Sequence, residues 1–410
     1  MSVLRRFRAL RPPAELTAEI AAVPYDVMDS KEARALAAGK QRSYLHVTRP
    51  EIDLPEDIDL HDDVVYAKAA ENFCRFLEQG WLLEDARPGL LVYRLIRDGR
   101  QQTGVVGCCS VDEYDTDLIV KHEKTRPDKE DDRTRHLLTL SAHAEPVFLA
   151  HAPHPGIDRL VEEATVGEPL YDVSAEDGVR HIVWGAPDPD ALEAAFAELP
   201  RLYVADGHHR CASASRARAA RRDANPAGHT GDEEYNFFLA TVFPSDQLSI
   251  LAYNRVVTDL GEHSPAGFLE ALRSRFPVRT DAPPSPVQAG QVSFYLDGDW
   301  YGLDLVSAHR SGTADPVAML DVARLQEDVL TPLLGIGDPR TDQRIGFVGG
   351  IRGPEDLAAR VDRGDAAVAF SMYPLSMQEL MNVADAGLVM PPKSTWFEPK
   401  LRSGLFIHRF

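Results

Sequence analysis

One short stretch of the sequence combines residue types that could bind an anion or a metal ion. Asp206, Gly207, His208, His209 and Arg210 follow an apolar run and precede a segment rich in alanine and arginine. This pattern predicts that the five residues join a strand to a helix. A glycine lets a ligand approach the backbone, and a helix N-terminus offers unpaired N–H groups and a partial positive charge. Because arginine also suits bidentate phosphate contact, the stretch favours a phosphate site.

Two other interpretations of this stretch remain open. Asp206 could cap the helix, orient a histidine, or hold a magnesium ion carried by a nucleotide. If Asp206 only caps the helix, the histidines would be ordinary packing or surface residues. A metal site built from His208 and His209 together is disfavoured, because adjacent residues on a helix point about 100° apart. No HExxH spacing accompanies them either.

A second run of ionisable residues, VKHEKTRP, begins at Val120. If it continues a strand, alternation predicts that His122 and Lys124 face one way and Lys121 and Glu123 the other. Glu123 could act as a carboxylate base for a hydroxyl substrate, and Lys121 and Lys124 could contact phosphates. The alternative is a solvated strand end of mixed charge.

Two further carboxylates are candidates for the same role of base. Asp26 follows Pro24 and Tyr25 at a predicted rigid turn, and Glu51 lies in the stretch TRPEIDLP. Asp26 could equally serve as a capping or turn residue. The sequence does not rank Asp26, Glu51 and Glu123 as bases.

The second half of the chain supplies candidate contacts for a substrate. Asn254 and Arg255 follow an apolar strand, and Arg255 could clamp a carboxylate or phosphate or form an ion pair. Arg344 lies in the loop DPRTDQR, and Lys393 precedes a serine and a threonine. No GxxxxG precedes Lys393, so a P-loop is excluded, but a contact to substrate from this region is expected.

Mixed strands and helices must position these residues. Helical spacing of apolar residues predicts a helix over 62–79, ended by Gly80. Hairpins are predicted around Asp98-Gly99 and Asp297-Gly298, and a strand pair around Ser245-Asp246. Several hairpins among helices indicate an α+β protein with mixed sheets and flanking helices, not a doubly wound sheet.

The length of 410 residues predicts two domains. We expect an N-terminal α+β domain over 1–262 that carries both ionisable motifs. A C-terminal α+β domain over 263–410 is expected to close over the site. The proline-rich stretch at 280–291 is the best candidate for a linker or long loop.

Composition narrows the class of partner and the compartment. The formal net charge of −20 disfavours a nucleic-acid surface, and no apolar run approaches the roughly 18 residues that span a bilayer. The start of the chain has no apolar core of a secretory signal. Four cysteines without a CxxC pair fit a reducing compartment. We therefore expect a cytoplasmic protein that binds neither nucleic acid nor membrane; a homodimer is one assembly it could form.

Several long strings resemble one bacterial and archaeal family. They include YVADGHHR, KHEKTRPDKEDDR, YNRVV, DPRTDQRIGFVGG and MPPKSTWFEPKLRSGL. Together they resemble the DUF1015 family, a domain of unknown function, from one end of the chain to the other.

The DGHHR turn is also similar to a turn of the ParB and sulfiredoxin superfamily. That superfamily binds nucleotide phosphates at a helix N-terminus and includes kinases that phosphorylate free L-serine with ATP or ADP. This resemblance implies a ParB/sulfiredoxin-like nucleotide-binding core, ATP or ADP and Mg²⁺ as cofactors, and a small amino acid as substrate. It implies phosphate contacts at Gly207, His208, His209 and Arg210, with His209 also among the catalytic residues and Asp206 as a ligand of the metal.

Two alternatives to a kinase stay open. One is a nucleotide-binding regulator of ParB type without phosphotransfer. The other is a metal-dependent phosphoesterase or nuclease, which is disfavoured because no cluster of metal ligands is evident in the sequence. Sulfiredoxin activity is disfavoured, because the sulfiredoxin cysteine lies inside the turn and this chain has histidine there.

Overall fold

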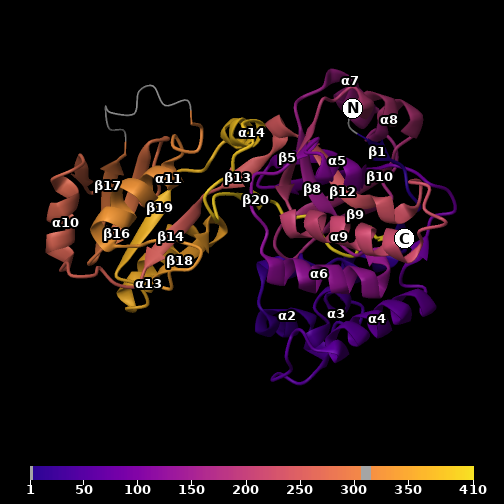
Figure 1. Cartoon of the computed structure of the whole chain (residues 1–410), viewed down its shortest axis with the longest axis horizontal. Helices are drawn as coiled ribbons and strands as arrows, with labels where there is room; N and C mark the ends of the chain where they lie inside the picture. Colours follow the sequence, from indigo (N-terminus) through magenta and orange to yellow (C-terminus); the bar gives the residue numbers. More distant parts are fainter. Residues whose placement is uncertain (1–2, 306–314) are drawn as a thin grey trace. The chain divides into compact units, whose positions relative to one another are not determined.

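The computed structural model describes residues 3–305 and 315–410. The chain divides into two compact units, one of Met1–Leu248 with Pro399–Phe410 and the other of Ser249–Glu398 (Figure 1). The sequence suggested a boundary after residue 262, whereas the chain enters the second unit at Ser249 and returns to the first at Pro399. Closure of a C-terminal domain over the site stays a prediction.

The first unit is built on a mixed sheet of nine strands. Its order is β6-β11-β8-β12-β5-β4-β10-β9, and β1 pairs with β5 beside this path. The pairs β6–β11 and β8–β12 are parallel, and the other pairs are antiparallel. In chain order the strands are β1 (Leu4–Arg5), β4 (Leu91–Arg97), β5 (Arg100–Ser110), β6 (Ile119–Val120), β8 (Val147–His151), β9 (Tyr171–Ser174), β10 (Arg180–Gly185), β11 (Leu202–Asp206) and β12 (Phe237–Pro244).

In the first unit, one predicted hairpin is confirmed and one predicted strand pair is wrong. Asp98 and Gly99 both have positive φ and join β4 to β5, as predicted. The expected strand pair around Ser245 does not form, because β12 pairs with β5 and β8 inside the first unit. The strands that follow it, β13 (Ser249–Leu251) and β14 (Tyr253–Val257), belong to the second unit.

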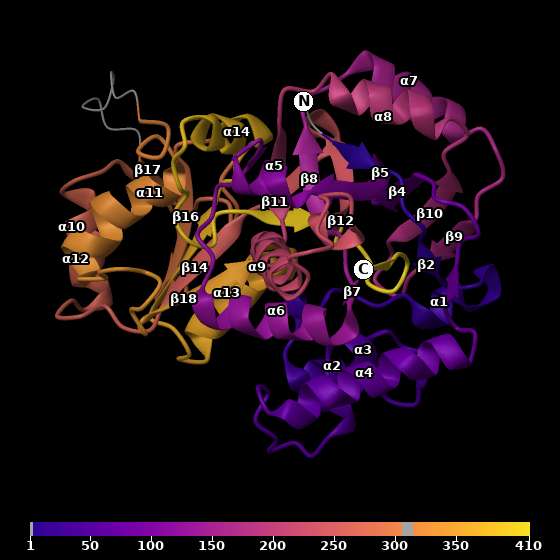
Figure 2. The same ribbon diagram turned by 45° about the vertical axis from the view of Figure 1, so that its right-hand side comes forward.

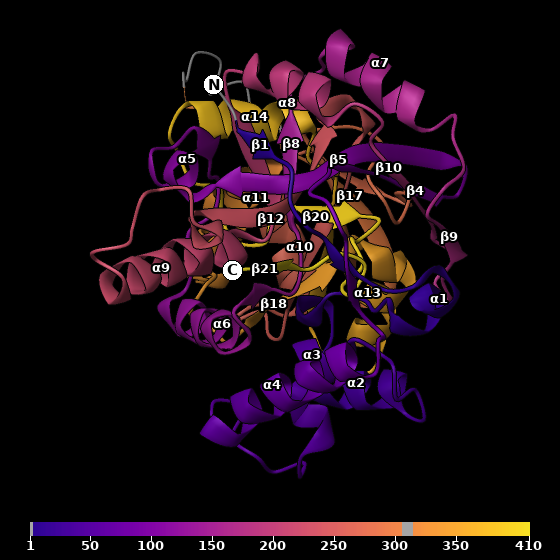
Figure 3. The same cartoon turned by 90° about the vertical axis from the view of Figure 1, so that its right-hand side faces the viewer.

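Helices cover one face of this sheet. Alternate strand residues, such as Val105, Val147 and Val204, pack against residues of α5, α7, α8 and α9 in one core. Helix α6 packs against α9 on one side and against α4 on the other, and α2 and α3 lie beside α4 (Figures 2 and 3). The bounds are α1 (Thr17–Ile20), α2 (Ser30–Ala37), α3 (Leu45–Thr48), α4 (Asp63–Glu78), α5 (Val111–Asp115), α6 (Pro127–Leu140), α7 (Pro155–Ala164), α8 (Pro189–Ala197) and α9 (His208–Ala224).

The C-terminal segment 399–410 packs on the other face of the sheet, against strand residues that alternate with those beneath the helices. The ring of Phe406 contacts Tyr93 of β4 edge to face, with 5.3 Å between ring centroids. Arg402 donates through Nε to Nε2 of His181 in β10 at 3.2 Å. Two short sheets complete the unit: β2 (Leu10–Arg11) with β3 (Leu83–Glu84), and β7 (Ala142–His143) with β21 (His408–Arg409).

The second unit has an antiparallel six-stranded sheet of its own, in the order β15-β17-β16-β19-β14-β18. Its strands are β14, β15 (Val278–Thr280), β16 (Gln291–Leu296), β17 (Asp299–Asp304), β18 (Ile345–Gly349) and β19 (Val368–Met372), while β13 pairs with β20 (Trp396–Glu398). Its helices are α10 (Pro265–Arg273), α11 (Asp321–Leu325), α12 (Thr331–Leu334), α13 (Gly353–Asp362) and α14 (Met377–Asp385). The predicted hairpin at Asp297-Gly298 joins β16 to β17.

The α+β class is confirmed, because each unit combines its own sheet with flanking helices. Across residues 3–305 and 315–410, none of the helices combines the length and the apolar composition that a bilayer crossing requires.

Candidate functional site

The two ionisable motifs meet because the strands that precede them are parallel neighbours. Residues Leu202 and Tyr203 of β11 pair with Ile119 and Val120 of β6. The carboxyl ends of parallel strands lie at the same edge of a sheet, so the loop after β6 and the turn after β11 emerge side by side. The helices α6 and α9 that follow these turns pack against each other.

The turn after β11 consists of a single residue in a left-handed conformation. Gly207 has φ 97° and ψ 30° and is the N-cap of α9. A Cβ added there would lie 3.1 Å from Nε and 3.2 Å from Cζ of Arg210. Both the positive φ and the packed guanidinium therefore favour glycine at this position. The predicted strand-to-helix junction is confirmed.

The N-terminus of α9 is suited to an anion. Its N-cap residue provides no side-chain cap, and its first turn contains no acidic residue. The first N–H groups of a helix lack partners within the helix, and the helix dipole is positive there. His209, in this first turn, accepts a hydrogen bond at Nε2 from the backbone N–H of Arg126, the N-cap of α6, at 3.1 Å.

Charged side chains from two distant segments, Asp26 and Lys400, meet the charged residues of the turn. Nζ of Lys400 lies 2.9 Å from Oδ2 of Asp206, and Nη2 of Arg210 lies 3.4 Å from Oδ2 of Asp26. Nη1 of Arg210 donates to the carbonyl of Pro146. Burial raises the pKa of the Asp206 carboxyl, but the charges of Lys400 and Arg210 together lower it by more. The pKa therefore falls below its usual range. Asp206 is therefore a carboxylate at neutral pH.

A second carboxyl group, largely buried, lies in the same network. Burial raises the pKa of Glu145, and the nearby charge of Arg210 only partly offsets that rise. Glu145 accepts hydrogen bonds from the hydroxyl of Ser403 and, at 3.2 Å, from the backbone N–H of Tyr25. Arg133 of α6 stacks over the ring of Tyr25, with its Cζ 4.2 Å from the ring centroid. The segment with Asp26 is thus tied to both the sheet edge and α6.

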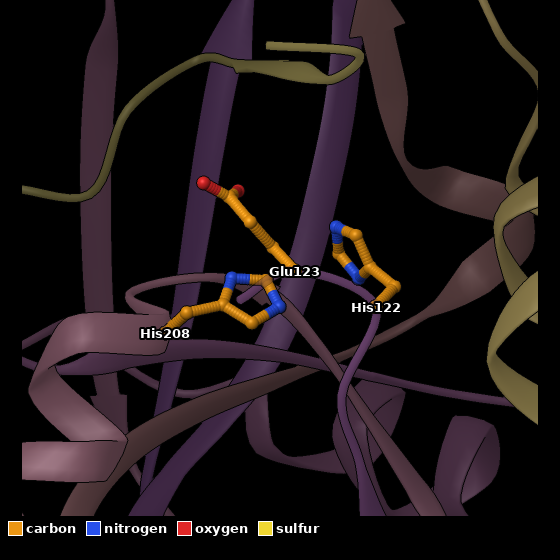
Figure 4. Close-up of side chains that lie close together, drawn as sticks. All are labelled: His122, Glu123 and His208. Carbon is orange, nitrogen blue, oxygen red and sulfur yellow. The ribbon is translucent and has the colours of Figure 1, made fainter. Parts of the chain in front are cut away.

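The loop after β6 brings two of its side chains to the start of α9. The ligand atoms of His122, Glu123 and His208 all lie within 4.8 Å of one another. The imidazole rings of His122 and His208 meet edge to face, with 4.4 Å between centroids and 88° between planes. Figure 4 shows the carboxylate of Glu123 extending past the two rings. The expected strand alternation fails here, because β6 ends at Val120 and residues 121–126 form a loop.

Both histidines of this cluster are buried, and burial sets their charge. It lowers the pKa of His122 to about 4, against a smaller opposing effect of the Val204 carbonyl. Burial, followed by the charge of His122, holds the pKa of His208 well below its ordinary value. Both rings are therefore neutral at pH 7.

The other N-terminal candidates are placed less centrally. Lys121 forms an ion pair with Asp117 at 2.9 Å and lies over the ring of Tyr114, with Nζ 4.2 Å from its centroid. Lys124 is exposed. The buried carboxylate of Glu51 accepts from the hydroxyl of Ser30 at 2.9 Å and pairs with Arg49 at 3.0 Å.

The candidates of the second unit make contacts within that unit. Oδ1 of Asn254 accepts from the backbone N–H of Met372 at 3.0 Å. Burial lowers the pKa of Arg255, next to the carbonyl of Tyr253, to about 10. Lys393 has φ 54° and lies 5.4 Å from the ring centroid of Tyr253.

Arg344 holds the end of α12 and the loop that follows it. Its guanidinium donates to the carbonyls of Leu334 at 3.1 Å and Gly335 at 2.9 Å, and it contacts Asp259 and Asp342. These contacts describe structural roles for residues that the sequence offered as substrate contacts. A role in binding substrate stays a prediction for all four.

Three residues of this site were missed as functional residues from sequence. His122 stood in the motif but was not assigned a role, and Glu145 and Lys400 were not considered. Lys400 lies in the string PPKSTWFEPKLRSGL, which was noted for its resemblance to the family, and that is the one signal that could have indicated it. Glu145 follows the stretch HLLTLSAHA and carries no local signal.

Several solved structures are similar to this chain at low identity and low TM-score. SbnI with a C-terminal truncation from Staphylococcus aureus is 15% identical, with a TM-score of 0.37 over 74% of this chain and 87% of SbnI. A mutant free serine kinase in complex with ADP is 14% identical, with a TM-score of 0.34 over 72% of this chain and 87% of the kinase. A conserved hypothetical protein from Pyrococcus furiosus is 12% identical, with a TM-score of 0.33 over 74% and 95%.

Comparison with curated proteins gives no match. Residues 4–323 match the model of a family described as "Protein of unknown function (DUF1015)". This match spans well over half of the chain and contains both the loop after β6 and the turn at Gly207. The chain belongs to the DUF1015 family.

Proposed function

We propose that this protein is a small-molecule kinase. It would transfer a phosphoryl group from ATP or ADP to the hydroxyl of a free amino acid, with L-serine as acceptor and O-phosphoserine as product. The observation that carries the proposal is the uncapped N-terminus of α9 with carboxylates from two distant segments, Asp26 and Glu123, beside its first turn. The resemblance of the DGHHR turn to that of free-serine kinases supports the same assignment.

The phosphate part of the proposal rests on α9. Gly207 lets the backbone approach a ligand closely, and the helix dipole favours negative charge at His208 and His209. A phosphate could also reach Arg210 and Lys400, although both cations now face carboxylates. Phosphoryl transfer depends mainly on positioning and on positive charge around the transferred group, and this edge of the sheet offers both.

Asp26 is the carboxylate that we assign as general base. Its side chain is 33% exposed and lies beside Arg210 at the turn. The side chain of Glu51 is 6% exposed and already faces Arg49. In the proposed step the acceptor oxygen bonds to the terminal phosphorus, the bond from that phosphorus to the bridging oxygen breaks, and Asp26 takes the hydroxyl proton. The shortened nucleotide leaves with the electron pair of the broken bond.

Magnesium would reach the site with the nucleotide. Mg²⁺ prefers oxygen ligands and often keeps its water, and the phosphates would supply most of these oxygens. Asp206, predicted as its protein ligand, is bound by Lys400 and faces Arg210. That ion pair would have to open before the carboxylate could reach a metal, and the assignment of Asp206 stays a prediction.

The test of the proposal separates binding from transfer. The protein is incubated with ATP or ADP, Mg²⁺ and each hydroxyl amino acid, and products are followed by phosphorus NMR, while calorimetry measures nucleotide binding. We expect O-phosphoserine. If nucleotide binds and no acceptor gives a product, the kinase is wrong and a nucleotide-responsive regulator is the remaining reading. If no nucleotide binds, both are wrong.

The assignment of the base has its own matched variants. Asp26→Asn should lower the rate of transfer by about 10²–10⁴-fold, as loss of a general base does, with nucleotide affinity changed less than threefold. Asp172→Asn removes an equal charge from an ion pair on β9 and should leave the rate unchanged. A Glu51→Gln variant that loses transfer while Asp26→Asn keeps it would move the role to Glu51.

A further inference from the structure

We propose that His122, Glu123 and His208 bind a divalent transition-metal ion, with Zn²⁺ as the best match. The three ligand atoms already lie within 4.8 Å of one another, although His208 is 85 or more residues from the other two along the chain. The proposal goes beyond the kinase and does not depend on it, because the ion would bind without nucleotide or acceptor.

Unsatisfied nitrogens provide the independent observation. His122 is 2% exposed and His208 is 5% exposed. Among the described residues, no hydrogen bond of normal geometry reaches either ring nitrogen of His122 or Nε2 of His208, and the Val204 carbonyl is the backbone group near His122. An unpaired buried polar group costs about 1–3 kcal/mol, and such groups are rare in native proteins. An ion shared by the two touching rings would take one nitrogen from each, and the Val204 carbonyl lies near enough to His122 to accept from its other ring nitrogen.

The type of donor selects the metal. Two imidazoles and one carboxylate suit Zn²⁺ and its transition-metal neighbours, whereas Mg²⁺ and Ca²⁺ prefer oxygen donors. Two histidines with one glutamate are also a recurrent ligand set of zinc sites that keep a fourth position open. Ligands at about 2.0–2.2 Å from a tetrahedral ion lie roughly 3.3–3.6 Å apart. Side-chain shifts of about 1 Å would therefore complete the site.

The backbone supports this arrangement from both sides. His122 and Glu123 are adjacent in a loop, where consecutive side chains are not held to opposite faces as they would be in a strand. His208 is the first residue of α9, fixed by the single-residue turn at Gly207. The metal would lie at the start of α9, where an open position could accept water or a phosphate oxygen. A metal-dependent step on a phosphorylated ligand is thus chemically accessible at this site.

Metal content is the direct test. The full-length protein is stripped with a chelator, dialysed, and titrated with Zn²⁺ alone, and bound zinc is measured by mass spectrometry. We expect one tightly bound ion per chain. Co²⁺ bound in its place should give the visible absorption of a four- or five-coordinate site. A protein that remains folded and binds no Zn²⁺ or Co²⁺ under these conditions overturns the proposal.

Variants identify the ligands. His122→Asn and His208→Asn should each weaken zinc binding by at least about 100-fold, since loss of outer-shell partners alone costs 10–100-fold. The control is His136→Asn, which removes another buried histidine of the same unit, whose Nε2 faces the carbonyl of Val47 at 2.9 Å; it should retain the ion. Thermal unfolding shows whether each variant folds.

Glu123→Gln keeps the proposal testable if a histidine variant does not fold. Glu123 is only partly buried, and the amide preserves its shape, so the fold should survive while zinc affinity falls at least tenfold. Full zinc binding in this variant and in either histidine variant contradicts the site. The kinase assay is independent of this result, because it scores phosphorylated product and the metal titration contains no nucleotide.

Discussion

The two strand-to-helix connections at this edge of the sheet differ in length and in what they present. Six residues separate the end of β6 at Val120 from the start of α6 at Pro127, whereas Gly207 alone separates β11 from α9. The long loop carries His122 and Glu123 toward the neighbouring turn. The short turn carries no side chain of its own and instead brings a helix N-terminus to the end of its strand.

The two helix N-termini differ in charge as well. The first turn of α6 contains Asp128 and Glu130, whereas the first turn of α9 contains no acid. Acidic side chains satisfy the positive end of a helix dipole and repel a bound anion. The two connections, β6 to α6 and β11 to α9, therefore differ in what they can bind. The N-terminus of α9 is suited to hold an anion, and the loop before α6 supplies side-chain ligands.

The largest effect is expected for the free energy of unfolding as the pH is lowered. It tests whether α6 differs from α9 beyond its N-terminus, at His136. Burial, assisted by the charge of Arg133, lowers the pKa of His136 in α6 to about 4. The folded pKa lies below the unfolded value of about 6.5, so the contribution to stability is present above pH 6.5 and is lost as the pH falls toward 4. The loss is about 1.4 kcal/mol per pH unit, or about 3 kcal/mol in all.

His136→Gln should therefore reduce the slope of unfolding free energy against pH between about 6.5 and 4 by about 1.4 kcal/mol per pH unit, while other buried histidines, such as His122 and His151, keep the rest of the slope. Denaturant unfolding of both proteins across this range measures the slopes. Equal slopes would show that folding does not lower the pKa of His136.

An intermediate effect is expected at the turn of α9. Gly207→Ala places a Cβ at φ 97° and against the guanidinium of Arg210. A left-handed conformation costs an ordinary residue about 1–2 kcal/mol, and the displaced guanidinium should weaken ADP binding about tenfold or more. Gly178→Ala is the matched control, because Gly178 has φ 81° and open space around its Cβ position.

Both glycine variants should lose stability through the positive φ, and only Gly207→Ala should also lose affinity for ADP, as measured by thermal unfolding and by calorimetry. If both variants bind ADP as well as the unmodified protein, the turn of α9 is not the phosphate site and the comparison of the two helix termini loses its functional meaning.

The smallest effect is expected at the start of α6. Glu130 accepts a hydrogen bond from the hydroxyl of Thr125 and lies 3.4 Å from Arg216 of α9. Glu130→Gln should cost about 0.3–1 kcal/mol of stability through the helix dipole and leave ADP affinity unchanged. Urea unfolding and calorimetry test the two parts. A change of more than threefold in affinity would mean that the N-terminus of α6 also takes part in binding.

Local sequence signals predicted the elements but not their pairing. Apolar spacing and Gly80 located α4, Asp98-Gly99 located a hairpin, and the DGHHR stretch was placed correctly at the start of a helix. Each of these features is decided within a few residues. The strand pair expected around Ser245 was wrong, because β12 finds both of its partners more than 80 residues earlier in the chain.

The cluster of His122, Glu123 and His208 could not be predicted for the same reason: it forms only because two distant strands pair. β6 is two residues long, so periodicity could neither show where the strand ends nor predict its pairing with β11. Alternation consequently assigned His122 and Glu123 to opposite sides. Considering His208 only with its neighbour His209 made a metal site look unfavourable, whereas the closer partner, His122, comes from the other motif.

The ion pair between Asp206 and Lys400 has a consequence for how the chain is made. A ribosome synthesises the DGHHR turn almost two hundred residues before it reaches Lys400, and the whole of Ser249–Glu398 emerges in between. Until then Asp206 lacks its lysine and β7 lacks β21. A nascent chain stalled before residue 399 should therefore expose an unfinished first unit to proteases and chaperones, even when its sheet has already formed.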